Sequence, residues 1–449
     1  MANTLLTISK ITNEALMVLE NSLTFTSEVE RSYDDQFAVV GAKIGNTLNV
    51  RKPGRFIGTT GPALAVEDFN ETSVPVTLST QFHVDTQFST QDLALSLDMF
   101  SDRVLKPAIA AIANKMDRDG LVMAKNTTAN IVGTAGTPPS SLLTFLNAGA
   151  YLDAEGAPRD GRRSCIIEPF TSATIVDGLK GLFVPNNTIT KQFQKGLMGT
   201  DSAGMDWKMD QNVVNQTFGS YATTTAFSCQ TATATGFLTT GWASTSTIAL
   251  SCATAVASLK QGDVIQIANV YAVNPQNRQA YGSNKLRNFV VQADVTVATS
   301  GTTSVIVSPA VITAGQFQNV SVTSPGASTV TPFNNTGVVS PQNIVMHKSA
   351  FTLACADLEL PDGVHFAARE TSSWVFRSAW CGSTLSTTIR SRLVLMCCTA
   401  GLHSTRNLLA GLPRNNQGSR SAPRFPTNSR KLSWPIPDPH QASKPTRRY

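Results

Sequence analysis

Hydrophobic residues recur with helical spacing along one long segment, residues 89–123. The spacing places five apolar residues on one face of a helix: Leu105, Ile109, Ile112, Met116 and Met123. Ser89, three positions before Asp92, resembles a capping box with Asp in the place of Glu, and it predicts a helix start at Ser89. Pro107 removes a hydrogen bond inside this segment, so we expect a kink or a fresh helix start there.

Before this helix, residues 41–85 alternate between apolar and polar positions, which predicts two strands of a long hairpin. Pro75 in the second strand indicates an edge position, because proline cannot donate to a ladder. The tip carries six charged residues that we expect at an inter-subunit contact: Arg51, Lys52, Arg55, Glu67, Asp68 and Glu71. A solvated loop on a sandwich domain is the alternative interpretation, since charged loop tips are commonly just exposed.

The flanking segments mix helices and strands. Residues 1–30 predict an N-terminal arm with a short amphipathic helix that must dock to be ordered. After a connection rich in Thr, Gly and Pro, we expect a helix over 140–154, a buried strand over 163–168 and a helix over 171–182. This alternation indicates an α+β body.

A change in composition sets residues 218–335 apart. Short alternating strands at 264–267, 289–292, 295–297 and 305–307 lie between Gly-containing turns, which predicts a small β-barrel or sandwich. Residues 343–347 then resume the composition of the chain before residue 218, so an insertion within a parent domain fits better than a second domain in tandem.

Composition limits the class of protein. The 449 residues are 41% hydrophobic, and no apolar run approaches the roughly 18 residues that span a bilayer. The N-terminal segment lacks the features of a signal peptide, so we expect a soluble protein made in a cytoplasm. The seven cysteines are scattered without a C-x-x-C pair, which predicts buried thiols rather than a disulfide framework or zinc site.

No pattern of catalytic, cofactor-binding or metal-ligating residues is found, and we expect a structural protein rather than an enzyme. Isolated histidines and acid pairs are more commonly polar surface or satisfied core residues than catalysts. These are His83, His347, His365, Asp34 with Asp35, and Asp357 with Glu359. Basic residues before Thr371 form no run that would indicate nucleic-acid recognition.

Several ordered segments resemble the major capsid proteins of tailed phages with the HK97-like fold, and in particular the phage P22 coat protein family. The segments are MANTLLTISKITNEAL at the start, GAKIGNTLNVRKP in the hairpin, LSLDMFSDRVLKPAIAAIANKMD in the helix, KQGDVIQIANVYAVNPQNRQ in the insertion, and NIVMHKSAFTLACADLELPDGVHFAARET after it. The resemblance covers about residues 1–371.

The resemblance implies an α+β HK97-like capsid fold with an inserted β-barrel domain. The implied parts are an N-terminal arm (1–38), an E-loop hairpin (39–86), a spine helix (87–126), a body of P- and A-domains (127–217 and 336–371), the insertion (218–335) and a basic tail (372–449). The implied function is a shell that assembles from hexamers and pentamers of this chain on a scaffolding protein around a portal. The shell would enclose double-stranded DNA without reading its sequence, with no membrane and no cofactor, and it would assemble in the host cytoplasm. A β-rich adhesion or carbohydrate-binding protein is the alternative function.

The last 78 residues break the family pattern. Residues 372–449 hold twelve Lys and Arg against one acid, a net charge of +11, whereas residues 1–371 carry a net charge of −5. Reading the codons shifted back by one base turns Met396-Cys397-Cys398 into Val-Leu followed by Tyr or His, which fits the family's Val-Leu-Tyr-Gly ending. We therefore expect residues from about Ser372 onward to be read out of frame, without the strands that complete the body. A genuine basic tail that touches packaged DNA is the rival interpretation.

Overall fold

The computed structural model describes residues 17–19, 22–31, 47–52, 54–64, 66–69, 71–89, 106–178, 199, 202–221, 227–229, 236–252, 257–281, 285–299, 302–322, 328–333, 336–355, 366–371, 377–385, 390–400 and 403–404. The chain divides into two compact units, Met1–Gly411 and Leu412–Tyr449, and every described residue belongs to the first. Most of the predicted N-terminal helix, His365 and the acid pairs at 34–35 and 357–359 lie outside the described residues.

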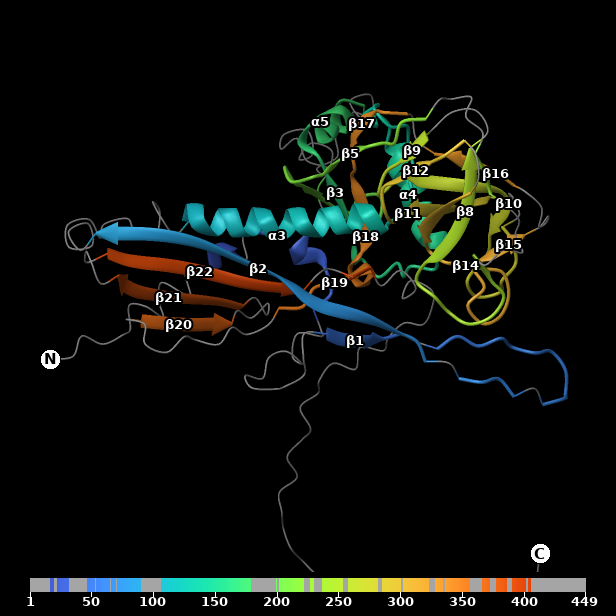
Figure 1. The fold of residues 1–449 in the computed structure, drawn as a ribbon, viewed down its shortest axis with the longest axis horizontal. Coiled ribbons are helices and arrows are strands. Elements are labelled where there is room, and N and C mark those ends of the chain that lie inside the picture. The colour runs from blue at the N-terminus through green and yellow to red at the C-terminus, as the bar shows by residue number, and fades with distance from the viewer. Residues whose placement is uncertain are drawn as a thin grey trace, which may run out of the picture. The chain divides into compact units, whose positions relative to one another are not determined.

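The predicted hairpin is confirmed and forms one end of a five-stranded antiparallel sheet (Figure 1). Its two strands are β1 (Thr47–Arg51) and the much longer β2 (Ser73–Ser89). The sheet continues in the order β1-β2-β22-β21-β20, with β20 at Phe366–Thr371, β21 at Arg377–Leu385 and β22 at Arg390–Ala400. The expectation that residues beyond Ser372 lack strands is therefore wrong, because β21 and β22 complete this sheet.

Pro75 occupies the edge position that its sequence context predicts. Its stretch of β2 pairs only with β1, opposite Asn49, and pairing with β22 begins at Leu78. One side of the backbone at Pro75 therefore has no ladder partner among the described strands, so the missing N–H of proline is tolerated.

Helix α3 (Lys106–Thr127) forms the centre of the main hydrophobic core. The predicted apolar face is confirmed for four of its five residues, since Ile109, Ile112 and Met116 are buried and Met123 packs against them. The fifth, Leu105, lies outside the described residues. The predicted start at Ser89 is wrong, because Ser89 ends strand β2 and pairs with Arg390. Pro107 lies in the first turn of the helix as described, where a missing N–H is tolerated. The choice between a kink and a fresh start depends on residues 90–105, which are not described.

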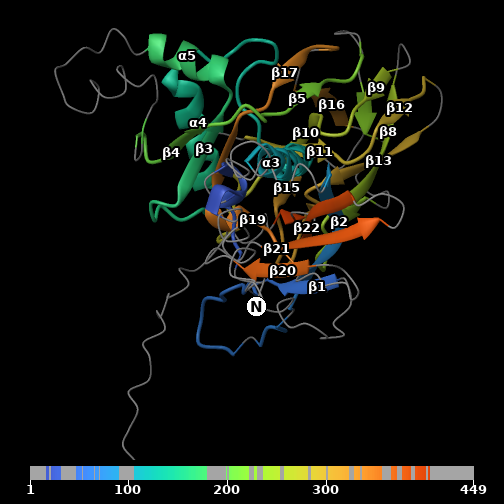
Figure 2. The same cartoon turned by 90° about the vertical axis from the view of Figure 1, so that its left-hand side faces the viewer.

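Strand β2 and the N-terminal arm pack on this helix (Figure 2). Phe82 and Val84 of β2 contact the core cluster that α3 forms, and Phe25 and Val29 of the arm are fully buried in it. The short 3-10 helix η1 (Thr26–Glu28) is held by Asp117 of α3, which accepts hydrogen bonds from the N–H groups of two arm residues. The arm therefore docks on its own subunit over the residues that are described.

The body contains the elements that the sequence predicts, and their described ends differ from the predicted ones by at most two residues. Residues 179–182 of the last predicted helix lie outside the described residues. Helix α4 spans Leu142–Ala154 and is capped by the hydroxyl of Ser141, strand β3 spans Arg163–Ile167 and is buried throughout, and helix α5 spans Pro169–Gly178. Strand β3 lies between β4 (Asp206–Met209) and β18 (Ile344–His347). The smaller elements are β5 (Asn215–Thr217) paired with β17 (Val339–Pro341), η5 (Lys348–Ala350), and β19 (Phe351–Thr352) paired with β23 (His403–Ser404).

The inserted segment forms a closed barrel, which is one of the two architectures that the alternating pattern predicts. Six strands pair in a ring, because β11 contacts both β13 and β10, and β15 adds to β10 outside the ring. The strands of the ring are β6 (Phe227–Cys229), β8 (Ser246–Cys252), β10 (Val264–Ala272), β11 (Leu286–Val291), β13 (Thr303–Ser308) and β16 (Ser328–Pro332). The remaining strands of the insertion are β7 (Phe237–Leu238), β9 (Ala257–Leu259), β12 (Val295–Val297), β14 (Val311–Ile312) and β15 (Val320–Val322).

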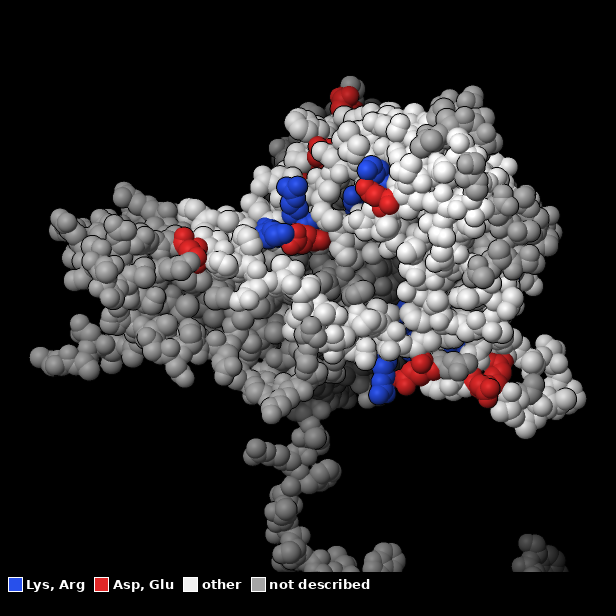
Figure 3. Space-filling model, viewed as in Figure 1, with Lys and Arg blue, Asp and Glu red and all other residues white. Residues whose placement is uncertain are grey.

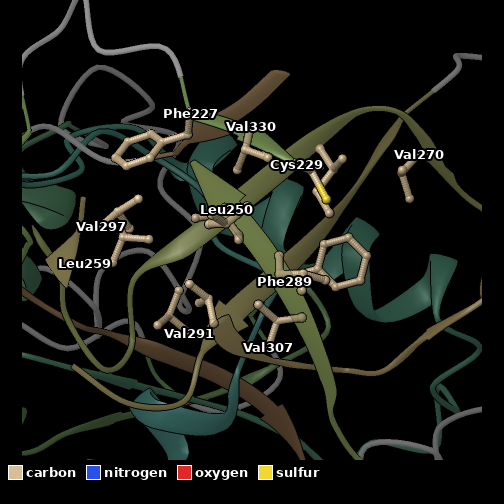
Figure 4. Packing of buried hydrophobic residues seen from close by; sticks show 14 of the residues in the cluster. Phe227, Cys229, Leu250, Leu259, Val270, Phe289, Val291, Val297, Val307 and Val330 are labelled. Atoms are coloured by element: carbon tan, nitrogen blue, oxygen red, sulfur yellow. The ribbon is translucent and has the colours of Figure 1, made fainter. Parts of the chain in front are cut away.

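The barrel has a hydrophobic core of its own. Phe227, Leu250, Phe289 and Val307 have at most a trace of exposed surface and point into the barrel interior (Figure 4). Such a closed core lets the insertion act as a discrete unit, since closure leaves few strand edges unpaired.

Candidate assembly interface at the hairpin tip

The hairpin tip, here the described residues between Lys52 and Thr72, is ordered by its own contacts. The two arms are linked by hydrogen bonds from the N–H of Lys52 to the carbonyl of Thr72 at 2.8 Å and from the N–H of Ile57 to the carboxylate of Glu67 at 2.6 Å. The rings of Phe56 and Phe69 stack with 5.9 Å between their centroids. These contacts let a loop of about twenty residues keep a defined form outside regular strand pairing.

The six charged residues that the sequence singles out have different surroundings. Arg51 and Glu71 face each other across the two strands at 3.5 Å, with side chains 77% and 45% exposed, so this pair is solvated. Lys52, in contrast, is buried, and its ammonium lies 4.0 Å from the centroid of the Trp242 ring in the inserted barrel. Burial lowers the pKa of Lys52 to about 8, and the nearby charge of Arg55 acts in the same direction.

The remaining three charged residues also have contacts within their own chain. Burial lowers the pKa of Arg55, which also senses the charges of Glu155 and of barrel arginines Arg278 and Arg287. The side chain of Glu67 closes the loop by accepting from a backbone N–H of the opposite arm. Asp68 contributes its carbonyl, which accepts a hydrogen bond from the side chain of Gln316 at 2.7 Å. The structure therefore brings Lys52, Arg55 and Asp68 to the barrel side of the tip and Arg51 and Glu71 to the strand end.

The tip also presents exposed apolar side chains that the charge pattern of the sequence did not indicate. Phe56 and Phe69 are each 61% exposed, Leu64 is 91% exposed and Val66 is 83% exposed. The sequence does contain a signal for this exposed apolar surface. These apolar residues lie in a Gly- and Pro-containing stretch, where a solvated loop would carry polar residues. In Figure 3 the loop at the lower right ends in uncharged surface, and the acidic side chains lie along the loop before that end. Exposed apolar side chains near charged ones are typical of a surface that meets another protein.

A seam of polar contacts joins the barrel to the body. Arg287 pairs with Glu155 after helix α4, Tyr281 donates its hydroxyl to the carbonyl of Ala154, and the ammonium of Lys285 lies 3.5 Å from the centroid of the Tyr151 ring. A cavity of about 450 Å³ lies beside this seam, lined by α4, the connection at 128–141 and part of the barrel. The pKa of Tyr281 is raised by burial and by the charge of Glu155.

No cluster of metal-ligating residues occurs in the part of the chain that the structure describes. His347 is buried and is satisfied by Asp160 at 3.0 Å and Ser349 at 2.7 Å, which is the structural role expected for an isolated histidine. His83 lies 3.8 Å from Asp85 on strand β2. Cys165, Cys229, Cys252 and Cys355 are buried thiols, as predicted. Among the described helices, none is long and apolar enough to cross a membrane.

Several solved structures that align with this chain are described as phage structures or phage capsids. A structure described as Mycobacterium phage Che8 aligns with a TM-score of 0.40 and 11% identity over 85% of this chain and 89% of that chain. The capsid of Ralstonia phage GP4 gives a TM-score of 0.39 and 8% identity over 85% and 84% of the two chains. The capsid of the cyanophage P-SCSP1u gives a TM-score of 0.38 and 9% identity over 84% and 86%.

The match to a protein family is more direct. No curated protein matches this chain. The family described as "P22 coat protein - gene protein 5" matches residues 1–399, which extends the resemblance beyond the boundary expected at 371. The described elements, an arm, a long hairpin, a long helix, an α+β body and an inserted barrel, are those expected for this family. The chain therefore belongs to the P22 coat protein family, and it is a bacteriophage major capsid protein with an α+β, HK97-like fold.

Proposed function

We propose that the hairpin tip is a contact through which subunits of this capsid protein join into the shell. The exposure of Phe56, Leu64, Val66 and Phe69 supports this proposal most directly. Exposed apolar groups are costly to leave in water, and their burial against a neighbour stabilises association at roughly 25 cal/mol per Å². Arg51 and Glu71 would lie at the rim, where charges direct encounter and contribute little affinity.

The finer features of assembly are part of the same proposal. Copies of the chain form hexamers and pentamers on a scaffolding protein around a portal in the host cytoplasm, and the shell encloses double-stranded DNA without reading its sequence. The chain works as a structural protein and not as an enzyme. The domain boundaries are those given by the resemblance, with residues 218–335 as a barrel inserted between the two parts of the body at 127–217 and 336–371.

Electron microscopy of the purified protein, with and without a scaffolding protein, tests this function. The wild-type chain should form shells or shell-like polymers, and the double variant Leu64→Ser, Val66→Ser should remain unassembled because its tip loses apolar area. Leu143→Ser is the matched control, since Leu143 is 62% exposed on helix α4 and lies outside the tip. Soluble wild-type monomers that bind a glycan, or equal assembly by the tip variant and the control, would contradict the proposal.

A further inference from the structure

Three contacts join the hairpin tip to the inserted barrel of the same chain. The ammonium of Lys52 lies over the Trp242 ring at 4.0 Å. The guanidinium of Arg278 donates to the carbonyl of Phe56 at 2.8 Å. The side-chain amide of Gln316 donates to the carbonyl of Asp68 at 2.7 Å. The contacts involve both arms of the loop. They therefore fix the orientation of the whole loop relative to the barrel.

Two of the barrel residues belong to one compact corner of the barrel. Strands β7 and β14 pair in parallel there, and Ile312 and Phe317 are buried in a small apolar cluster against which Trp242 packs. Gln316 directly precedes Phe317, so both contacts are made by residues whose backbone is held by this cluster. A rigid support of this kind reduces the entropy lost when the hairpin binds.

The third barrel residue is held in an uncommon backbone conformation. Arg278 has a φ of 60° and lies in the left-handed region, where residues other than glycine are rare. Its N–H donates to the carbonyl of Asn274 at 2.8 Å, which closes the turn between β10 and β11. Such strain persists where the surrounding structure requires it, and here the turn directs the guanidinium to the hairpin.

The environment of Lys52 also fits a contact within the subunit. Lys52 is only 8% exposed, although it lies at the base of a loop rich in solvated charges. Taking an ammonium out of water is unfavourable unless a partner compensates, and the face of a tryptophan ring is the best aromatic partner for a cation. A lysine that binds a neighbouring subunit would be exposed in the single chain, as the side chain of Arg51 is.

We propose that the corner of the inserted barrel around Trp242 is a docking site for the hairpin tip of the same subunit, with Lys52 as its anchoring residue. The docked barrel holds the loop in one direction before a neighbouring subunit is met. The rings of Phe56 and Phe69 stack on each other within the loop that the barrel holds. The exposed apolar side chains of the tip are therefore preorganised for binding. Lys52 is thus a positioning residue, and its role in assembly rests on the proposed function of the tip.

Hydrogen exchange of unassembled full-length subunits, read by mass spectrometry, tests the docking. Lys52→Met keeps most of the side-chain volume and removes the cation, and Trp242→Leu removes the ring. Each should raise the exchange rate of peptides from residues 54–69 by about threefold to fivefold, which corresponds to the loss of one cation–π contact. The double variant should show no further increase, because both single changes remove the same interaction.

Two control variants distinguish docking from a general effect. Lys52→Arg keeps a cation over the ring and should leave exchange near the wild-type rate, and Arg51→Met removes a neighbouring exposed charge and should also have little effect. Peptides from β8 and β13 report whether the barrel remains folded in every variant. Additive effects of Lys52→Met and Trp242→Leu, or an unchanged loop in a folded barrel, would overturn the docking proposal.

The test separates this inference from the proposed function. A wild-type loop that is protected in the single subunit, in a protein that forms no shells, would support the docking and overturn the role of the tip in assembly. Shells formed by a wild-type protein whose loop exchanges as fast as that of Lys52→Met would overturn the docking and leave the role of the tip in place.

Discussion

A single buried carboxylate, Asp117, ties the N-terminal arm to the central helix. Its side chain accepts hydrogen bonds from the N–H of Thr24 at 2.8 Å, the N–H of Thr26 at 2.9 Å and the hydroxyl of Thr26 at 2.8 Å. Burial raises the pKa of Asp117 above its ordinary value, and the charge of Asp210 adds to this, whereas the three hydrogen bonds oppose it. An acid on the apolar face of α3 is therefore explained by donors of the arm that would otherwise be buried without partners.

Replacement of this carboxylate should destabilise the arm. In Asp117→Asn an amide NH₂ faces a backbone N–H, so at least one hydrogen bond is lost at a cost of about 1–3 kcal/mol. The thermal unfolding midpoint measures the effect. Asp119→Asn is the control on the same helix, because Asp119 is 43% exposed in its ion pair with Lys115 and should contribute no more than about 0.5 kcal/mol.

The same variant has a defined pH dependence. Because the pKa of Asp117 is raised in the folded state, its contribution to stability is fully present below the unfolded pKa and is lost as pH rises through the folded value. The advantage of the wild-type chain over Asp117→Asn should therefore widen as the pH is lowered from 7 towards 4. An advantage that narrows on acidification would show that the ionised form is the favoured one in the folded protein.

At the scale of elements, a second buried carboxylate controls how the chain enters the barrel. Asp263 precedes β10 and accepts hydrogen bonds from the side chain of Gln216 at 3.0 Å, the N–H of Gly219 at 3.0 Å and the N–H of Lys260 at 2.9 Å. The carbonyl of the Gln216 side chain in turn accepts from Lys125 of α3. The strand that leads into the barrel is thus linked both to the barrel and to the end of the central helix.

Loss of this acid should loosen the connection without unfolding the barrel. In Asp263→Asn an NH₂ group faces at least one of the three donors, so hydrogen exchange of a peptide covering 215–221 should accelerate while peptides from β8 keep their protection. Asp294→Asn is the matched control, since Asp294 is 59% exposed and pairs with Lys260 at the surface. Equal exchange of the 215–221 peptide in the two variants would contradict the role of Asp263.

The elements predicted correctly from sequence are those whose pattern is local. The barrel strands and the apolar face at Ile109, Ile112 and Met116 follow from periodicity alone. A local capping signature predicts a helix at Ser89, but the pairing of Ser89 with a strand some three hundred residues away keeps it extended. The contact of Lys52 with the Trp242 ring is equally invisible in the sequence, since a lysine beside a Pro-Gly turn has the pattern of a solvated tip. Contacts between segments distant in sequence determine both the extended backbone at Ser89 and the burial of Lys52.

At the scale of the whole molecule, the hairpin and the central helix share one hydrophobic core, whereas the barrel has a core of its own. The barrel joins the body through polar contacts and a small apolar cluster of Ala129, Val264 and Val290. The body core and the barrel core contain separate sets of buried residues. The polar links between them include Gln216 with Asp263, Arg287 with Glu155, and Lys52 with Trp242.

The C-terminal segment has features that bear on the reading frame from which it is translated. The family match ends at residue 399, and nine of the twelve basic residues beyond Ser372 follow that point. Strands β21 and β22 lie within 377–400, so this part of the chain extends the sheet of β2 in its present reading frame. A shift of one base over Met396-Cys397-Cys398 nevertheless gives Val-Leu followed by Tyr or His, as the family's ending requires.

Determination of the coding nucleotides decides between a shifted frame and a genuine basic tail. We expect a single inserted or deleted base near codon 372 whose correction replaces the Arg-rich segment by the family's ending and removes the +11 charge. The corrected and uncorrected chains can then be compared for binding to double-stranded DNA at low and high salt, because a DNA-binding tail loses contacts with phosphate as salt rises. If no single-base change near codon 372 restores the family's ending, the tail is genuine and its contacts with DNA become the question.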